Sequence, residues 1–271
     1  MEIMNPPNGN IKTTERAYIV YILFIMFFCS GLCSLVYQVV WVRLAFAHFG
    51  IITPVLSVVI SVFMLGLGAG SVIAGRGVDA WTKRLQTSPV RFYAAAECGI
   101  AIGAFTVPWL FQFGENALLR LGDAGSAQYL LVSALYLTAA ILPWCLLMGA
   151  TFPLMMSFVR RTWPTETTGF SFLYLANVIG AMVGAALTAG VLVELLGFRR
   201  TSVLAAVINL TIAAVAFFLG SRFPSSAGRV ARHIDRMEES ELAAGSRSSY
   251  LQPGLPRWRW KSLGFAPSPL F

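Results

Sequence analysis

The sequence predicts an all-α integral membrane protein with six transmembrane helices, and composition and hydropathy are the main reasons. Only 12% of the 271 residues are charged and 57% are hydrophobic, and the mean hydropathy is +0.71. Soluble domains carry about 25% charged residues, so this chain has too few to cover a surface that faces water. Six apolar runs, each near the roughly 20 residues that a bilayer requires, supply the predicted spans.

The first three predicted spans are residues 17–41, 51–75 and 92–113. The first span contains no formal charge, and it is longer than the apolar core of about 7–15 residues that a signal peptide carries. We therefore expect a retained transmembrane helix that ends with Trp41 at the outer membrane interface. Residues 1–16 are polar, and we expect them to form a disordered cytoplasmic leader.

Small residues recur every four positions along the second span. Gly66, Gly70 and Ala74 leave one helix face almost bare, which allows a neighbouring helix to approach closely. The chain then introduces Arg76 and Asp79, three positions apart, where the apolar run ends. This pattern indicates a tight cytoplasmic turn. Two interpretations fit it: a glycine-rich packing helix with a polar end, and the gating turn of a transporter half.

The last three predicted spans are residues 129–158, 170–196 and 202–220. The fourth contains two prolines, which membrane helices tolerate as kinks. A minimal turn, residues 197–201, separates the fifth span from the sixth. The glycines that we expect to bring helices together are Gly66, Gly70, Gly99, Gly103, Gly180 and Gly184.

Basic residues predict the orientation of the spans. Most of the 20 Lys and Arg residues lie in the leader, in the segments after the second and fourth spans, and in a basic tail, residues 221–271. Cytoplasmic segments carry such an excess, so we expect a multi-pass protein of the bacterial inner membrane with both termini in the cytoplasm. The tail is rich in Ser, Gly, Pro and Arg, and it is either disordered or held on an anionic membrane surface.

Glu97 is the best candidate for a functional group inside the membrane. It lies within the third apolar run, and a carboxylate at membrane depth is costly and usually faces a cavity or a partner. A protonatable or cation-binding group is one interpretation. The alternative is a carboxylate near the inner interface that pairs with Arg76 or Arg91.

Three further polar residues lie in predicted spans and complete the candidate intramembrane site. Gln38 and Asn177 either contribute to it or simply tie helices together by hydrogen bonds. Glu194 lies within about a turn of Arg199 and Arg200, which favours a salt bridge at the interface over a role in the site.

Several classes of function are disfavoured. The two histidines, His48 and His233, lie far apart in sequence, so we expect neither a metal site nor a catalytic cluster. The four cysteines lie in apolar runs, where they act as small packing residues rather than as a disulfide framework. Residues 66–70 (GLGAG) lack the spacing and the preceding strand of a nucleotide loop. The net charge of +8 lies largely in the tail and in loops beside apolar spans, so we expect no nucleic-acid partner.

Five sequence stretches, together with Glu97, occur in an order that is also found in a known protein family. The stretches are residues 30–43 (SGLCSLVYQVVWVR), 63–79 (FMLGLGAGSVIAGRGVD), 143–153 (PWCLLMGATFP), 174–184 (YLANVIGAMVG) and 197–201 (GFRRT). In these stretches the chain resembles the bacterial spermidine-synthase-like membrane proteins, described as fusions of a major-facilitator-type membrane region with an aminopropyltransferase domain. The resemblance covers roughly residues 17–220, and Glu97 stands where the third helix of that family carries an acid.

The resemblance implies a six-helix bundle similar to half of a major-facilitator-type transporter. Two departures limit what it implies. Gln38 stands where the family usually has Glu, which argues against proton handling there. Nothing in residues 221–271 matches the family's soluble catalytic domain, with its glycine-rich cofactor loop and paired acids, and no second six-helix repeat follows. We therefore expect one membrane half, free-standing or cut short, with no cofactor and no catalytic residues of its own.

Two functional hypotheses follow. The first is a module in the lipid bilayer that handles or senses a small cationic amine such as a polyamine, together with a second copy or another membrane half. The second is a non-catalytic anchor for a separate soluble aminopropyltransferase, which docks on the basic tail.

Overall fold

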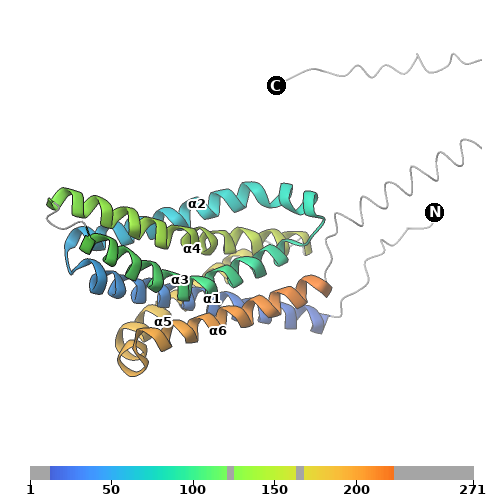
Figure 1. Ribbon diagram of the computed structural model, residues 1–271. Helices are drawn as coiled ribbons and strands as arrows, with labels where there is room; N and C mark the ends of the chain where they lie inside the picture. Colours follow the sequence, from blue (N-terminus) through green and yellow to red (C-terminus); the bar gives the residue numbers. More distant parts are fainter. Residues whose placement is uncertain (1–12, 121–124, 163–167, 223–271) are drawn as a thin grey trace, which may run out of the picture. The chain divides into compact units, whose positions relative to one another are not determined.

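The computed structural model describes residues 13–120, 125–162 and 168–222. Regular structure in these residues is helical throughout. In chain order the elements are α1 (Thr13–Phe49), α2 (Thr53–Leu85), α3 (Pro89–Arg120), α4 (Ser126–Thr162), α5 (Thr168–Leu187), one π-helical turn η1 (Thr188–Leu192) and α6 (Val193–Arg222) (Figure 1). Residues 1–12 of the predicted leader and nearly all of the predicted tail lie outside the described residues. Residues 13–16, predicted to belong to a disordered leader, are helical and begin α1.

Five helical stretches of the described chain are long and apolar enough to cross a membrane. They are Tyr18–Phe49, Thr53–Leu85, Pro89–Arg120, Ser126–Thr162 and Ser171–Arg222. An all-α protein with membrane-length helices is therefore confirmed, and the architecture is compatible with a multi-pass membrane protein. The fifth and sixth predicted spans both lie within the last stretch, which has 52 residues, so six separate crossings stay a prediction.

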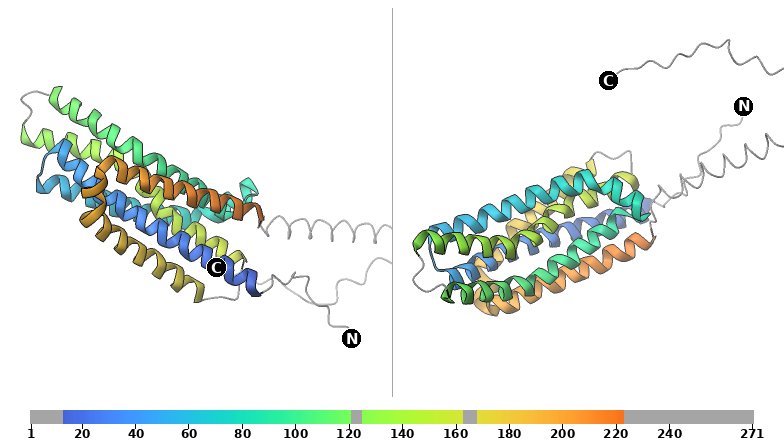
Figure 2. Two further views of the ribbon diagram at one scale, coloured as in Figure 1. Left: turned by 90° about the horizontal axis from the view of Figure 1, so that it is seen from below. Right: turned by 45° about the horizontal axis from the view of Figure 1, so that its top comes forward.

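The last stretch is not straight. Gly184 of α5 lies against the backbone of Leu32 in α1, and the Cys33 thiol of α1 donates a hydrogen bond of 3.6 Å to the carbonyl oxygen of Ala205 in α6. A straight helix would separate positions 184 and 205 by about 30 Å at 1.5 Å per residue. The chain folds back at Gly197, whose φ of 71° and ψ of 173° are not helical, so that α5 and α6 run in opposite directions (Figure 2).

The helices pack around α1. This helix contacts α5, α6 and α3, while α2 lies along α4 and α3 lies between α4 and α6 (Figure 1). Trp41 is fully buried in α1 and stacks on Tyr37, with ring centroids 5.3 Å apart. The prediction of an interfacial tryptophan at the end of the first span is wrong, because α1 continues to Phe49 and carries Trp41 into the core.

The predicted packing glycines lie where helices meet. A Cβ atom on Gly66 or Gly70 would collide with α4, and one on Gly180 or Gly184 would collide with the backbone of α1. Gly99 and Gly103 instead face the Leu147 and Trp144 side chains of α4. Such close backbone contact is how membrane helices gain packing energy without a hydrophobic driving force between them.

The structure contradicts the predicted turn at Arg76 and Asp79. α2 continues through both residues to Leu85 and ends where Gln86 adopts a left-handed conformation with φ of 46°. The glycines in this stretch weaken a helix without stopping it, and the Trp81 ring lies over Gly77 one turn away. Arg76 and Asp79 are therefore helical residues near the end of α2, and the short connection to α3 begins at Gln86, seven positions after Asp79.

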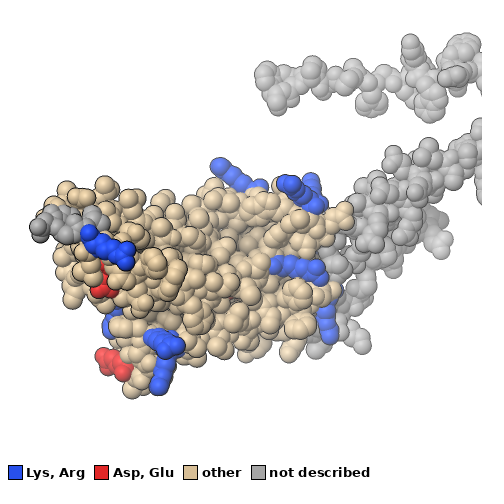
Figure 3. Space-filling model, viewed as in Figure 1, with Lys and Arg blue, Asp and Glu red and all other residues tan. Residues whose placement is uncertain are grey.

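Charged side chains cluster toward the two ends of the described bundle. On the face drawn in Figure 3, Lys and Arg lie at both ends and an uncharged band separates them. The helices α1 to α4 have 32 to 37 residues, or about 50 Å at 1.5 Å per residue. This exceeds the roughly 30 Å of a bilayer's hydrocarbon core, so upright helices would extend past it.

Candidate functional site

Glu97 lies at the meeting point of three helices. It projects from α3, and none of its surface is exposed. The Ser30 hydroxyl of α1 donates a hydrogen bond of 2.7 Å to its Oε1 atom, and the Asn209 amide of α6 donates one of 3.0 Å to its Oε2 atom. Two neutral side chains from different helices thus hold the two oxygens of one carboxyl group.

Two buried polar atoms beside Glu97 have no hydrogen-bond partner. One is the Asn209 Oδ1 atom, an acceptor. The other is the Tyr93 hydroxyl, one turn before Glu97, which lies beside Glu97 and Ser30 but meets no partner with full hydrogen-bond geometry. Buried polar groups are normally paired, so this cluster has unused capacity for hydrogen bonds, including one acceptor without a donor.

No cation pairs with Glu97 among the described residues. The alternative ion pair with Arg76 or Arg91 is wrong: the Arg91 guanidinium lies over the Phe217 ring, 5.5 Å from its centroid, and Arg76 is exposed. A buried carboxylate without a counter-charge is costly. The group therefore suits either a proton or a small cation that brings its own N–H donors.

The other predicted site residues do not join Glu97. Gln38 of α1 is half-buried and makes no hydrogen bond within the described part of the chain. Asn177 of α5 lies against Gly31 of α1, at a close contact between these two helices. Glu194 is exposed at the start of α6, and the described residues offer it no ion pair. The structure thus brings together Glu97, Ser30, Asn209 and Tyr93 instead.

Sequence reasoning named none of these three partners as a site residue. Ser30 and Tyr93 lie in predicted spans, where neither residue type is unusual, and no pattern in the sequence marks them. Asn209 is a polar residue with a strong hydrogen-bonding side chain in the sixth predicted span, and such residues often join membrane helices. That signal was available, but it names no partner.

A second polar contact lies at the end of the bundle where α2 ends. Arg161 of α4 donates to the Asp79 carboxylate of α2, so Asp79 pairs with another helix and not with Arg76. The pair borders a cavity of about 270 Å³, which Gly75, Ser157 and Arg160 also line.

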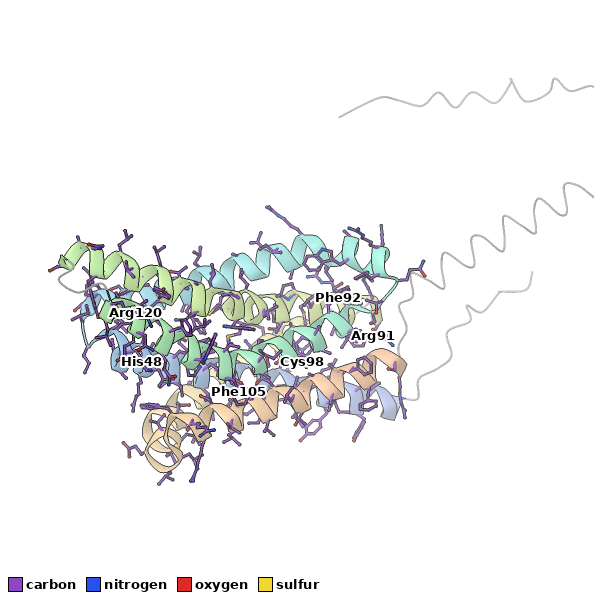
Figure 4. All side chains as sticks on the ribbon, in the orientation of Figure 1. His48, Arg91, Phe92, Cys98, Phe105 and Arg120 are labelled. Atoms are coloured by element: carbon purple, nitrogen blue, oxygen red, sulfur yellow. The ribbon has the colours of Figure 1, made fainter. Side chains whose placement is uncertain are left out.

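A third contact lies at the opposite end of the bundle. His48 Nδ1 of α1 and Glu115 Oε2 of α3 are 2.5 Å apart, and the His48 ring packs edge-on against Phe111. Figure 4 shows His48 at the same end as Arg120, and Arg91 at the other. The described residues contain no group of three His, Cys, Asp or Glu side chains arranged to hold a metal.

Two curated proteins of Streptomyces coelicolor are similar to this chain. It is 26% identical over 205 residues to polyamine aminopropyltransferase 1, which is 75% of this chain and 35% of that protein. It is 28% identical over 191 residues to polyamine aminopropyltransferase 2, which is 70% of this chain and 32% of that protein. No family model and no solved structure matches. The chain spans about a third of the length of these relatives and is distantly similar to polyamine aminopropyltransferases over that part.

Proposed function

We propose that this chain is a multi-pass membrane module that binds a small cationic amine of the polyamine type at Glu97. One observation carries the proposal: a fully buried carboxyl group on α3 accepts hydrogen bonds from neutral donors on α1 and α6, and no cation among the described residues pairs with it. The distant similarity to proteins named for polyamine chemistry supports the choice of amine.

The chemistry of an ammonium group fits the site. A primary ammonium carries three N–H donors and no acceptor. The carboxylate has lone pairs left after its bonds to Ser30 and Asn209, and the Asn209 Oδ1 atom has no donor. An ammonium would supply both the missing positive charge and a donor for the Asn209 Oδ1 atom. Because Glu97 is fully buried, the amine enters only when α3 moves relative to α1 or α6.

The proposed topology has six crossings. The reversal at Gly197 lets α5 and α6 each cross the membrane, and an even number of crossings places both termini on the same side. The excess of basic residues in the leader, in alternate connections and in the tail favours the cytoplasm for that side. The proposed location is the bacterial inner membrane, with the bundle acting as one half of a major-facilitator-type arrangement.

A second membrane half is part of the proposal. Gln38 is half-buried near the middle of α1 and has no hydrogen-bond partner among the described residues. An amide that meets lipid without a partner costs free energy. A second copy of the chain, or another membrane half, laid against this side of α1 would supply a partner. The Asp79–Arg161 pair between α2 and α4 would then act as a gate contact within each half.

Amine binding is tested with the full chain in lipid nanodiscs and radiolabelled spermidine as the probe. Glu97→Gln keeps the size of the side chain and removes its charge. Loss of a hydrogen bond to a charged group costs about 1.5–3 kcal/mol, so we expect binding to weaken about 10- to 100-fold. Glu115→Gln is the matched control, since Glu115 is partly exposed on the same helix. Absence of spermidine binding, or equal binding by Glu97→Gln and the wild type, overturns the proposal.

The second candidate function is a membrane anchor for a separate aminopropyltransferase. It is favoured because the relatives carry that name and extend to about three times the matched length. The predicted docking surface is the basic tail, which lies outside the described residues. Co-purification of aminopropyltransferase activity with the full chain, and its loss when residues 223–271 are removed, is the expected result. Equal recovery with and without the tail contradicts tail docking.

A further inference from the structure

A groove runs along the surface of the bundle between α3 and α6. Its volume is about 460 Å³, and its lining is apolar apart from one arginine. Ala95 and Cys98 of α3 and Ala214 of α6 are exposed along it, and Phe217 forms part of one wall. The groove exists because alanines on both helices leave space that the larger residues around them do not fill.

Arg91 stands at one end of this groove. Arg91 and Cys98 both line the groove, and Figure 4 shows Arg91 toward the end of the bundle. Its guanidinium lies over the Phe217 ring, 5.5 Å from the centroid, and its aliphatic stem packs beside Gly220. A cation–π contact orients the guanidinium but does not neutralise it. Arg91 is exposed and has no acidic partner in the described part of the chain, so its charge is free for a ligand.

We propose that this groove binds one anionic phospholipid, with an acyl chain along α3 and α6 and the phosphate on Arg91. A guanidinium presents a planar pair of donors that matches two phosphate oxygens. Basic pockets between membrane helices bind acidic lipid headgroups, and anionic lipids are abundant in the cytoplasmic leaflet. The end that carries Arg91 is the one predicted to face the cytoplasm.

The lining selects a lipid over a free anion. A soluble phosphate would meet a single arginine and no other polar side chain of the groove, whereas the apolar walls match a hydrocarbon chain. The groove also lies beside the functional cluster, because Cys98 follows Glu97 directly and Leu210 of the lining follows Asn209. A bound lipid therefore supports the contact between α3 and α6 across which the Asn209–Glu97 bond forms.

The experiment places a reporter cysteine at Ser221 of the full chain, with Cys29 replaced by serine and Cys98 by alanine. Ser221 is exposed near the end of α6 and lies outside the groove lining, so a fluorescent maleimide on Ser221→Cys leaves the groove open. Cys33 and Cys145 are buried and stay unlabelled. The labelled chain is placed in phosphatidylcholine nanodiscs that contain brominated-chain phosphatidylglycerol or brominated-chain phosphatidylcholine at equal mole fraction. We expect quenching to give an apparent affinity about fivefold higher for phosphatidylglycerol than for phosphatidylcholine. This is the difference that one arginine near the membrane surface contributes for an anionic lipid.

Two variants and a control identify the site. Arg91→Gln removes the charge, and Ala214→Phe fills the groove from an exposed position; each is expected to abolish the preference for phosphatidylglycerol. Arg84→Gln removes a basic residue from the last turn of α2, outside the groove lining, and is expected to keep it. Native mass spectrometry of unlabelled protein should retain one phosphatidylglycerol in the wild type and none in Arg91→Gln. Equal quenching by both lipids, or the same preference in Arg91→Gln and Arg84→Gln, overturns the proposal.

Discussion

At the scale of single residues, the Glu97 cluster is a hydrogen-bond network that joins α1, α3 and α6. Asn209 is buried and its amide donates to Glu97, 112 positions away in sequence. Removing the amide leaves a buried carboxyl oxygen with one fewer donor, and hydrogen bonds to charged groups contribute about 1.5–3 kcal/mol. We expect Asn209→Leu to lower the free energy of unfolding by about that amount, measured by thermal unfolding in detergent.

The control for this prediction is Thr211→Val on the same helix. The Thr211 hydroxyl is exposed and bonds only to the carbonyl of Val207 in its own helix, so little change in stability is expected. A double-mutant cycle separates the pair from general packing: in a Glu97→Leu background the cost of Asn209→Leu should shrink. An unchanged cost in that background would show that Asn209 acts through packing alone.

How far the sequence predicts this cluster depends on the residue. Glu97 stands out because it is an acid in an apolar run. The free-energy cost of placing a carboxylate inside a membrane applies whatever the fold. The partners of Glu97 depend on how α1 and α6 are rotated toward α3, since Ser30 and Asn209 are 67 and 112 positions away. Hydropathy gives the length of a span and not the rotation of the helix about its axis. The sequence alone therefore leaves open an ion pair between Glu97 and Arg76 or Arg91.

At the scale of the helices, the apolar runs predict which segments form long helices better than where those helices end. The charges at Arg76 and Asp79 end the apolar run, but a charged residue does not stop a helix. α2 ends where Gln86 turns left-handed, and α1 ends before Gly50, which has a φ of 86°. Helix ends depend on such backbone positions, so the predicted bounds are shorter than the helices at nearly every end.

Two glycines of α2 provide a matched test of helix packing. A Cβ atom on Gly70 would collide with the backbone of Leu146 in α4, whereas one on Gly68 would meet nothing within 4 Å. We expect Gly70→Ala to destabilise the bundle by about 1–3 kcal/mol, the usual cost of overpacking. Gly68→Ala should be neutral or stabilise it by up to about 1 kcal/mol, because alanine is the better helix former.

Thermal unfolding and size-exclusion chromatography of the two variants in the same detergent check this difference. The two substitutions add the same methyl group to the same helix, so helix propensity affects both alike. Equal melting temperatures for the two variants would show that the close contact between α2 and α4 is not maintained in the membrane protein.

At the scale of the whole molecule, the sequence separates six apolar runs, and the described chain contains five helical stretches of membrane length. The difference arises at Gly197, the one non-helical residue between η1 and the rest of α6. The sequence at residues 197–200, a glycine and a phenylalanine before two arginines, indicates a turn, and the fold-back around α1 agrees with it.

Cysteine labelling tests the six-crossing topology. In a background with the native cysteines replaced by serine, single cysteines are placed at Ile51, Leu85 and Arg199, all exposed at helix connections. With six crossings, Ile51→Cys and Arg199→Cys react with a membrane-impermeant maleimide from the periplasmic side. Leu85→Cys reacts only in inverted vesicles. If α5 and α6 formed one continuous span, position 199 would lie within the hydrocarbon and react from neither side. Because Ile51 and Arg199 are predicted to share a side that is opposite to Leu85, this one pattern decides both the number of crossings and the location of the termini.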